Sequence, residues 1–348
     1  ALEDSPGRVR FAQTEPISTY LFAFAAGPFE EIALPGEAVR LYVRRSQLER
    51  AREHAPEVLR LNRAALRYFE KEFARGFPFA KYDLVLIPEL AYGGMEHAGA
   101  TFLNEAAVLF PFVPSNPDLL RRAQLIFHET SHQWFGNLVT MRWFDDLWLK
   151  EGFANFMAAK AAAEILPGLE PWSAFHALKT SAYRIDATQG TTPLRQPLAN
   201  LSAAKSAYGA IVYSKGPAVL RQAEFYLGAA AFRRAVRDFL KAHAYGAADW
   251  SDLVRAFERA SKRDLKDWAD AWVKRRGLPN VALRWREGKL QLSQEDALGE
   301  RGVWPQKLVV AAAGEDGQIR TSETRLDKRS VRVVGTAAHP AARWLYAN

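Results

Sequence analysis

Two histidines and a glutamate have a spacing that suits one metal ion. Residues 128–132 read His-Glu-Thr-Ser-His, and on a helix His128 and His132 lie one turn apart on the same face. Glu151, in a second helical segment, offers an oxygen ligand. Two imidazoles and one carboxylate leave the fourth tetrahedral position of zinc for water, which is typical of catalytic sites. We therefore predict one zinc ion per chain, bound by His128, His132 and Glu151.

Glu129 is the candidate general base beside this metal. Zinc lowers the pKa of its water toward about 7 and polarises a carbonyl group. Glu129 is adjacent to a ligand and cannot share its direction, so its carboxylate can accept the proton of the water and pass it to a leaving amine. The alternative is a glutamate on the helix surface. The pattern favours metal-assisted hydrolysis.

The elements that hold these residues can be read from their surroundings. Ser115 or Asn116 can cap the start of the first helix, Pro117 suits its first turn, and Gly136 is expected to end it.

Three polar residues flank the helix that carries Glu151. Asp145 and Asp146 precede it and Asn155 lies one turn beyond Glu151. Each can cap or complement the helix, or support a zinc histidine through the other ring nitrogen. The sequence leaves both roles open, and we retain Asp146 and Asn155 as candidates for the supporting role.

Composition limits the class of protein. The 348 residues include no cysteine, so a metal must rest on His, Asp, Glu or water. The net charge of +8 is scattered along helical segments, which indicates a solvated basic face and no nucleic-acid partner. No apolar run reaches the roughly 18 residues of a membrane span. The first residues lack the features of a signal peptide. The compartment stays open, with the cytoplasm favoured over the periplasm or secretion.

The chain changes character along its length. Residues 8–32 are expected to be extended, 38–43 and 82–87 to form strands, and 46–73 to form a long amphipathic helix. From about 118 to 278 the pattern is almost wholly helical. Alternating polarity after residue 279 predicts a small antiparallel β domain over 279–348.

Four motifs in the right order closely resemble the aminopeptidase N family of gluzincin zinc peptidases. Besides the segments of the three metal ligands, Gly93-Gly94-Met95-Glu96-His97 resembles the family's Gly-x-Met-Glu-Asn loop, and Tyr213-Ser214-Lys215-Gly216 resembles its Tyr-x-Lys-Gly segment. Two further segments, Gly136-Asn137-Leu138-Val139-Thr140 and Trp143 to Trp148 leading into Glu151, add further likeness.

The resemblance implies an α+β fold with three parts. Residues 1–32 would be the tail of an N-terminal β domain, and 33–278 a thermolysin-like catalytic domain with a mixed-sheet lobe and a helical lobe. Residues 279–348 would be a small β-sandwich. Most of the family's N-terminal domain and its C-terminal helical domain have no counterpart, which suggests a fragment or a reduced member.

The resemblance also assigns a substrate loop. Glu96 would bind the α-amino group of the substrate, and Gly93 and Gly94 would let the loop backbone approach it closely. Met95 belongs to the same substrate-binding loop. His97 replaces the family's Asn. A supporting role for its ring is favoured over a second metal ligand.

Tyr213 would donate a hydrogen bond to the oxyanion. Tyr208 is the competing candidate, and either ring could instead belong to the core. The implied partners are peptides with a free N-terminus. Two alternatives remain, namely opening of an epoxide at the same zinc, as in the branch that resembles leukotriene A4 hydrolase, and an inactive truncated scaffold.

Overall fold

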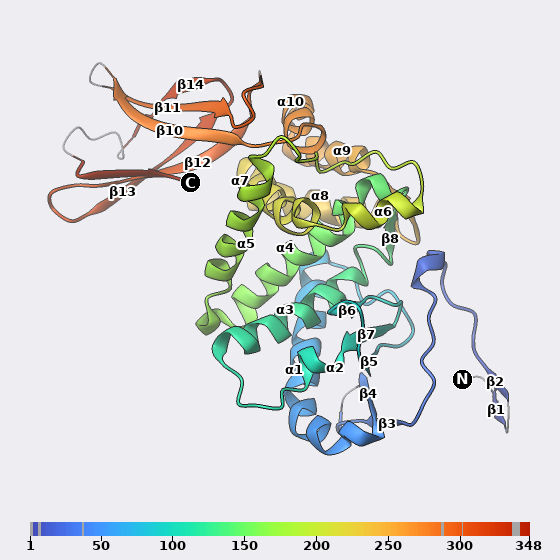
Figure 1. The fold of residues 1–348 in the computed structure, drawn as a ribbon. Helices are drawn as coiled ribbons and strands as arrows, with labels where there is room; N and C mark the ends of the chain where they lie inside the picture. The colour runs from blue at the N-terminus through green and yellow to red at the C-terminus, as the bar shows by residue number, and fades with distance from the viewer. Residues whose placement is uncertain (1–2, 6–7, 37, 287–288, 301, 336–341) are drawn as a thin grey trace. The chain divides into compact units, whose positions relative to one another are not determined.

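The computed structural model describes residues 3–5, 8–36, 38–286, 289–300, 302–335 and 342–348 (Figure 1). The chain divides into two compact units. The first unit comprises Ala1–Arg142, Phe153–Ser173 and Arg237–Asp249; the second comprises Trp143–Gly152, Ala174–Val236 and Trp250–Asn348. Helix α4 (Trp148–Ile165) begins in the second unit and continues in the first. Each unit is described by itself below.

A mixed β-sheet organises the first unit. Over the described residues its five strands lie in the order β3-β4-β5-β7-β6. The central strands β4, β5 and β7 are parallel, whereas the edge strands β3 and β6 are antiparallel to their neighbours. The bounds are β3 (Phe29–Ile32), β4 (Arg40–Arg44), β5 (Asp83–Ile87), β6 (Gly94–Met95) and β7 (Ala100–Asn104). This sheet confirms the mixed α+β class expected from the sequence.

The N-terminal stretch is less regular than the sequence suggested. Residues 8–32 hold only β2 (Arg8–Arg10), which pairs with β1 (Glu3–Ser5), the 3-10 turn η1 (Thr19–Leu21), and β3. The expectation of extended structure throughout was therefore wrong at Thr19–Leu21. Burial of Leu21, 2% exposed, holds this turn in place.

Two helices pack against each other and against the sheet (Figure 1). Helix α1 (Leu48–Phe73) contacts β3 and β4, and α3 (Asn116–His132) contacts β6 and β7. Phe69 and Phe73 near the end of α1 stack on each other and lie against Trp134, which follows α3. Burial of these large rings fixes α3 beside the strand that carries the Gly93–His97 loop.

The start of α3 follows the sequence, but its end does not. Ser115 and Asp118 form a capping box, with Pro117 in the first turn. The helix ends at His132, so Gly136 lies outside it. After His132 the chain turns tightly, because the amides of Asn137 and Leu138 bond back to the carbonyls of His132 and Gln133.

A parallel strand pair interrupts the region expected to be helical. Strands β8 (Val139–Met141) and β9 (Gly246–Ala248) belong to the first unit and pair in parallel. Each is three residues long and its partner is distant in sequence. Local periodicity carries no signal for such a pair, so this strand pair is an exception that the expectation of an almost wholly helical region did not identify.

Helices make up most of the remaining chain before residue 279. Their bounds are α2 (Glu105–Val108), α5 (Pro171–Asp186), α6 (Leu201–Ala207), α7 (Gly216–Leu227), α8 (Ala229–Ala242), α9 (Trp250–Ser261) and α10 (Lys266–Ala269). Short 3-10 segments are η2 (Arg45–Gln47), η3 (Phe144–Asp146) and η4 (Pro167–Leu169), and π-helical segments are η5 (Ile211–Lys215) and η6 (Asp270–Lys274). No helix in the described ranges combines the length and apolarity that crossing a membrane requires.

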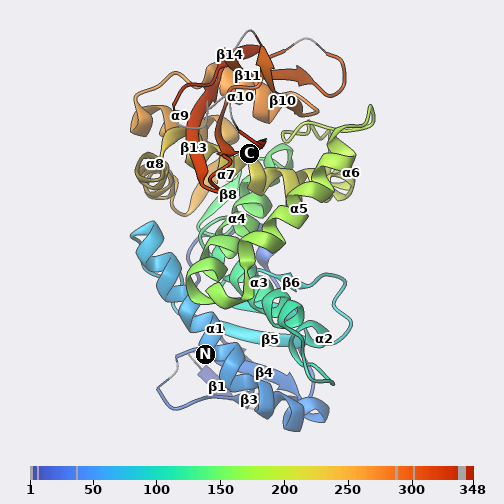
Figure 2. The same cartoon turned by 90° about the vertical axis from the view of Figure 1, so that its left-hand side faces the viewer.

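The C-terminal part of the second unit is antiparallel β structure, as the alternating sequence predicts (Figure 2). Over the described residues, one sheet has the order β10-β11-β14 and another β13-β12-β15. The bounds are β10 (Pro279–Arg286), β11 (Lys289–Asp296), β12 (Gln306–Ala313), β13 (Ile319–Leu326), β14 (Ser330–Arg332) and β15 (Trp344–Ala347). Leu290, Leu292, Val310 and Leu326, each at most 1% exposed, share the core of this part.

This core predicts a large cost for truncating Leu292, which is 0% exposed. Leu292→Ala should lower the free energy of unfolding by about 2–5 kcal/mol, because it removes buried methyl groups and leaves a cavity. Leu201→Ala on α6, where the side chain is 57% exposed, is the matched control and should cost less than about 1 kcal/mol. Urea denaturation of the two variants makes the comparison. Equal costs would contradict a packed core at Leu292.

Candidate functional site

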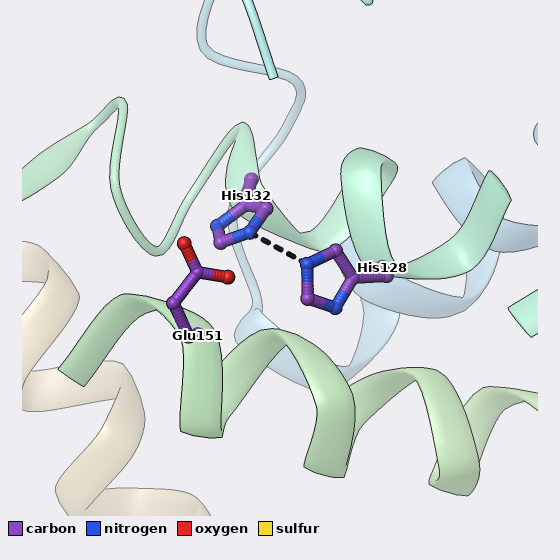
Figure 3. Close-up of side chains that lie close together, drawn as sticks. All are labelled: His128, His132 and Glu151. Atoms are coloured by element: carbon purple, nitrogen blue, oxygen red, sulfur yellow. Dashed lines mark hydrogen bonds between the residues drawn. The ribbon is translucent and has the colours of Figure 1, made fainter. Parts of the chain in front are cut away.

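The structure brings together the three residues expected to bind a metal (Figure 3). His128 and His132 come from α3 and Glu151 from α4. One ligand atom of each lies within 4.8 Å of the others, and the two Nε2 atoms are 3.0 Å apart. These residues form a group that could hold a metal ion.

Hydrogen bonds at the Nδ1 atoms of His128 and His132 orient both rings. His132 Nδ1 donates to the Phe135 carbonyl at 2.8 Å, and His128 Nδ1 lies 2.7 Å from Asn155 Oδ1. Because a carbonyl oxygen only accepts, this network assigns the ring proton to Nδ1 and the electron pair to Nε2. Two electron pairs that face each other at 3.0 Å repel unless a cation lies near both. The donor set therefore fits a metal ion. Asn155 contacts one of the two histidines, and its role in supporting a metal ligand stays a prediction.

Glu151 has a partner that the sequence did not reveal. Lys150 Nζ donates to Glu151 Oε1 at 2.6 Å, and both side chains are only 4% exposed. The ammonium group favours the ionised carboxylate, which is the form that binds metal. Lys150 is adjacent to Glu151 in the sequence, but the sequence does not show that both side chains are buried. Their burial is what makes an ion pair between them necessary.

Glu129 lies against the backbone of the Gly93–His97 loop. It is 4% exposed, and a methyl group added at Gly94 would come within 2.5 Å of its Oε1 atom. Glycine at this position lets the edge strand β6 approach Glu129. Ligand atoms of Glu96, Glu129 and His132 also lie within 4.8 Å of one another. The predicted base and the predicted amine-binding residue thus share one buried neighbourhood.

Side-chain amides that the sequence did not single out fix the backbone of Glu96. Gln133 Nε2 and Asn137 Nδ2 both donate to the Glu96 carbonyl, at 3.2 and 2.6 Å. Gln133 Oε1 also accepts from the Gly99 amide at 3.0 Å. Gln133 follows directly after the His-Glu-x-x-His segment and Asn137 lies five residues beyond its end, so this short stretch of chain connects the helix of His128 and His132 to the loop.

His97 takes part in the support of this loop. Its Nδ1 atom donates to the Leu21 carbonyl at 3.0 Å, and its ring meets the edge of Phe102, the residue paired with Met95. Burial lowers the pKa of His97, against the opposing effects of the Leu21 bond and of the Glu96 charge. These contacts place His97 between the loop and the turn at Leu21, and its supporting role at the substrate site stays a prediction.

Tyr213 lies in the second unit, on the π-helical segment η5. The ring of Tyr208, the competing candidate, is centred 6.2 Å from the ring of Tyr213. Directly after η5, Gly216 packs on the first turn of α4, where a methyl group at Gly152 would lie 3.3 Å from the Gly216 backbone. The segments of Tyr213 and Glu151 are therefore in backbone contact.

A buried ion pair anchors the end of η5. Lys215 Nζ lies 2.8 Å from Asp186 Oδ2 and donates to the Gly277 carbonyl at 2.7 Å. Asp186 Oδ1 accepts from the Thr191 hydroxyl and the Gly277 amide. Burial lowers the pKa of Lys215, and the charge of Asp186 opposes this effect.

The two aspartates before α4 hold neighbouring loops. Asp146 Oδ2 accepts from the Trp250 amide at 3.2 Å, and Asp145 Oδ1 accepts from the Leu198 amide at 2.7 Å. These bonds tie the segment before α4 to later backbone of the second unit, and the choice between helix capping and support of a zinc histidine stays open for both residues.

Replacement of His97 should change how stability depends on pH. The folded pKa of His97 lies below its ordinary value of 6.5, so below that pH the unfolded chain binds more protons and stability falls as pH falls. His97→Asn should remove the contribution of His97 to the fall of the free energy of unfolding below pH 6.5. Above pH 6.5 the substitution should not change how the free energy of unfolding depends on pH. His176→Asn, at an exposed position on α5, should keep the wild-type slope. Urea denaturation across about pH 5 to 8 tests this, and identical slopes would contradict it.

Replacement of one partner of the Lys215–Asp186 pair should lower the free energy of unfolding substantially. Lys215→Met or Asp186→Leu alone leaves a buried charge without its counter-ion and should cost about 3–5 kcal/mol, whereas the double variant should cost less than the sum. The exposed pair Lys274–Asp270 provides the control, with a coupling of at most about 1 kcal/mol for the corresponding variants. A double-mutant cycle in urea gives both couplings. If the losses of unfolding free energy from the two single substitutions simply add up in the double variant, Lys215 and Asp186 are not coupled and the proposed ion pair is contradicted.

The sequence of this chain is similar to those of a known peptidase family. A model of the peptidase family M1 domain matches residues 58–272, which is more than half of the chain. Aminopeptidase M1-A of Oryza sativa subsp. japonica is 35% identical over 85% of this chain and 34% of its own length. Aminopeptidase N of Streptomyces lividans is 36% identical over 77% of this chain and 32% of its own length. Leucyl aminopeptidase of Saccharolobus solfataricus is 34% identical over 82% of this chain and 36% of its own length. The chain thus spans about a third of the length of these curated relatives. It belongs to peptidase family M1.

Proposed function

We propose that this chain carries the catalytic site of a zinc-dependent aminopeptidase, which hydrolyses the N-terminal peptide bond of peptides. The observation that carries the proposal is the gathering of His128, His132 and Glu151, in which the Nε2 atoms of the two imidazoles lie 3.0 Å apart. Relatives that align over most of the chain are named aminopeptidases, which supports the same activity.

Zinc is the metal that best suits the donor set. Two imidazole nitrogens and one carboxylate match catalytic zinc sites, and the chain has no cysteine to close the site. Zinc held there would supply Lewis acidity toward the scissile carbonyl and a lowered pKa for water. Asn155 and the Phe135 carbonyl keep the two rings in the orientation that binding requires.

Glu129 is the proposed general base. Its carboxylate accepts a proton from the attacking water and delivers it to the nitrogen of the leaving amine. Burial at 4% exposure excludes bulk water, and the close approach of Gly94 limits where the carboxylate can lie. Tyr213 is the proposed donor to the oxyanion, a contribution of about 3 kcal/mol in other enzymes.

Glu96 is the proposed anchor of the substrate α-amino group. A buried carboxylate forms a strong charge-assisted hydrogen bond with an ammonium group, and an acylated N-terminus cannot form it. Because β6 is an edge strand, the backbone of Gly94 and Met95 can pair with an extended peptide. With its amine at Glu96, a peptide presents its first peptide bond near Glu129. The proposed partners are therefore peptides with a free N-terminus.

The test compares amino-acid 4-nitroanilides that have free and acetylated N-termini. The zinc-loaded chain should hydrolyse only the free amines. Glu129→Gln should lower kcat by about 10²- to 10⁴-fold and retain one zinc by elemental analysis, because it removes the base and leaves the ligands. Glu53→Gln, an exposed residue of α1, is the matched control and should behave as wild type. Zinc-loaded protein that hydrolyses neither substrate, or both equally, would contradict the proposal.

A further inference from the structure

The 3-10 turn Thr19–Leu21 lies against the loop that carries Glu96. The Tyr20 hydroxyl is 3.2 Å from Glu96 Oε1 and 3.4 Å from the Gly136 carbonyl. A hydroxyl has one proton, and the charged carboxylate is both the nearer and the stronger acceptor. Tyr20 therefore donates to the carboxylate of Glu96.

A second bond ties the same turn to the next residue of the loop. His97 Nδ1 donates to the carbonyl of Leu21, and the Leu21 side chain is 2% exposed. Phe22 and Phe24, which follow in the chain, are 75% and 81% exposed. The segment is thus held at Tyr20 and Leu21, where it meets Glu96 and His97, while the phenylalanines just after it are open to solvent.

The two ends of Glu96 are held by different parts of the first unit. Gln133 and Asn137 bind its backbone carbonyl, whereas Tyr20 binds its carboxylate. The amides fix where the backbone of Glu96 lies, and the Tyr20 hydroxyl contacts its carboxylate oxygen Oε1. A carboxylate on a rotatable side chain needs such a contact to present its oxygens in one direction.

We propose that Tyr20 is a positioning residue for recognition of the substrate amine, so that the turn Thr19–Leu21 belongs to the substrate site. The inference rests on the proposed role of Glu96. A substrate ammonium group binds the carboxylate that Tyr20 has already oriented, and less freedom is lost when it binds. Tyr20 acts through Glu96 and does not itself touch the scissile bond.

The test measures binding, so that it does not depend on turnover. The zinc-loaded 348-residue chain is titrated calorimetrically with L-leucinol, an amino alcohol without a scissile bond, and with N-acetyl-leucinol. Tyr20→Phe should weaken the binding of L-leucinol about tenfold, because it removes one hydrogen bond to a charged group, and should leave the binding of N-acetyl-leucinol unchanged. Tyr42→Phe is the matched control, since the Tyr42 hydroxyl donates to Glu31 at 2.9 Å on an exposed part of the sheet.

A double variant separates positioning from a general loss of structure. In the Glu96→Gln background, Tyr20→Phe should have little further effect on L-leucinol, because both changes remove the same oriented carboxylate. Equal tenfold losses in both backgrounds would overturn the positioning role.

The remaining outcomes distinguish this inference from the proposed function. A wild-type chain that binds both compounds equally would overturn the role of Glu96, and the inference with it. A wild-type chain that prefers the free amine, together with a Tyr20→Phe variant that keeps this preference, would overturn the inference alone.

Discussion

Buried negative charge is the constraint on which the site depends. Glu96, Glu129 and Glu151 are each only 3–4% exposed, and His132 has ligand atoms within 4.8 Å of all three. Carboxylates withdrawn from water are costly unless cations or hydrogen-bond donors compensate them. Lys150 supplies one positive charge beside Glu151. A metal ion held by His128, His132 and Glu151 would add positive charge to this buried neighbourhood.

Hydrogen bonds from the turn after α3 hold several of these buried residues in place. The turn after α3 supplies Phe135 to one histidine and Gln133 and Asn137 to the loop of Glu96. A single stretch of chain therefore contacts both His132, a candidate metal ligand, and the proposed amine anchor. Large aromatic side chains around Trp134 keep that stretch in place.

The sequence predicted the features that depend on local order. The helix of His128 and His132, the long helix α1 and the antiparallel strands after residue 279 all follow from periodicity and capping residues. The grouping of the two histidines with Glu151 followed from motif spacing. The strand pair β8–β9 and the contacts of Tyr20, Gln133 and Asn137 join residues far apart in the chain, or depend on burial. Nothing in the local pattern distinguishes Tyr20 from an ordinary core aromatic. The division into 1–32, 33–278 and 279–348 stays a prediction.

The contact between Gly152 and Gly216 has a consequence for how this protein can vary. A methyl group on Gly152 would lie 3.3 Å from the backbone of Gly216, and one on Gly216 would lie 3.4 Å from the Cα atom of Gly152. In most packed pairs, a larger side chain on one partner can be offset by a smaller one on the other. Here neither residue has a side chain to shrink, so a gain at one position has no compensating loss at its neighbour. The only relief is a shift of backbone, which would move either the turn of Glu151 or the segment of Tyr213. A side chain at either position therefore asks the facing backbone to give by a few tenths of an ångström, so the close approach of these two segments favours glycine at both positions.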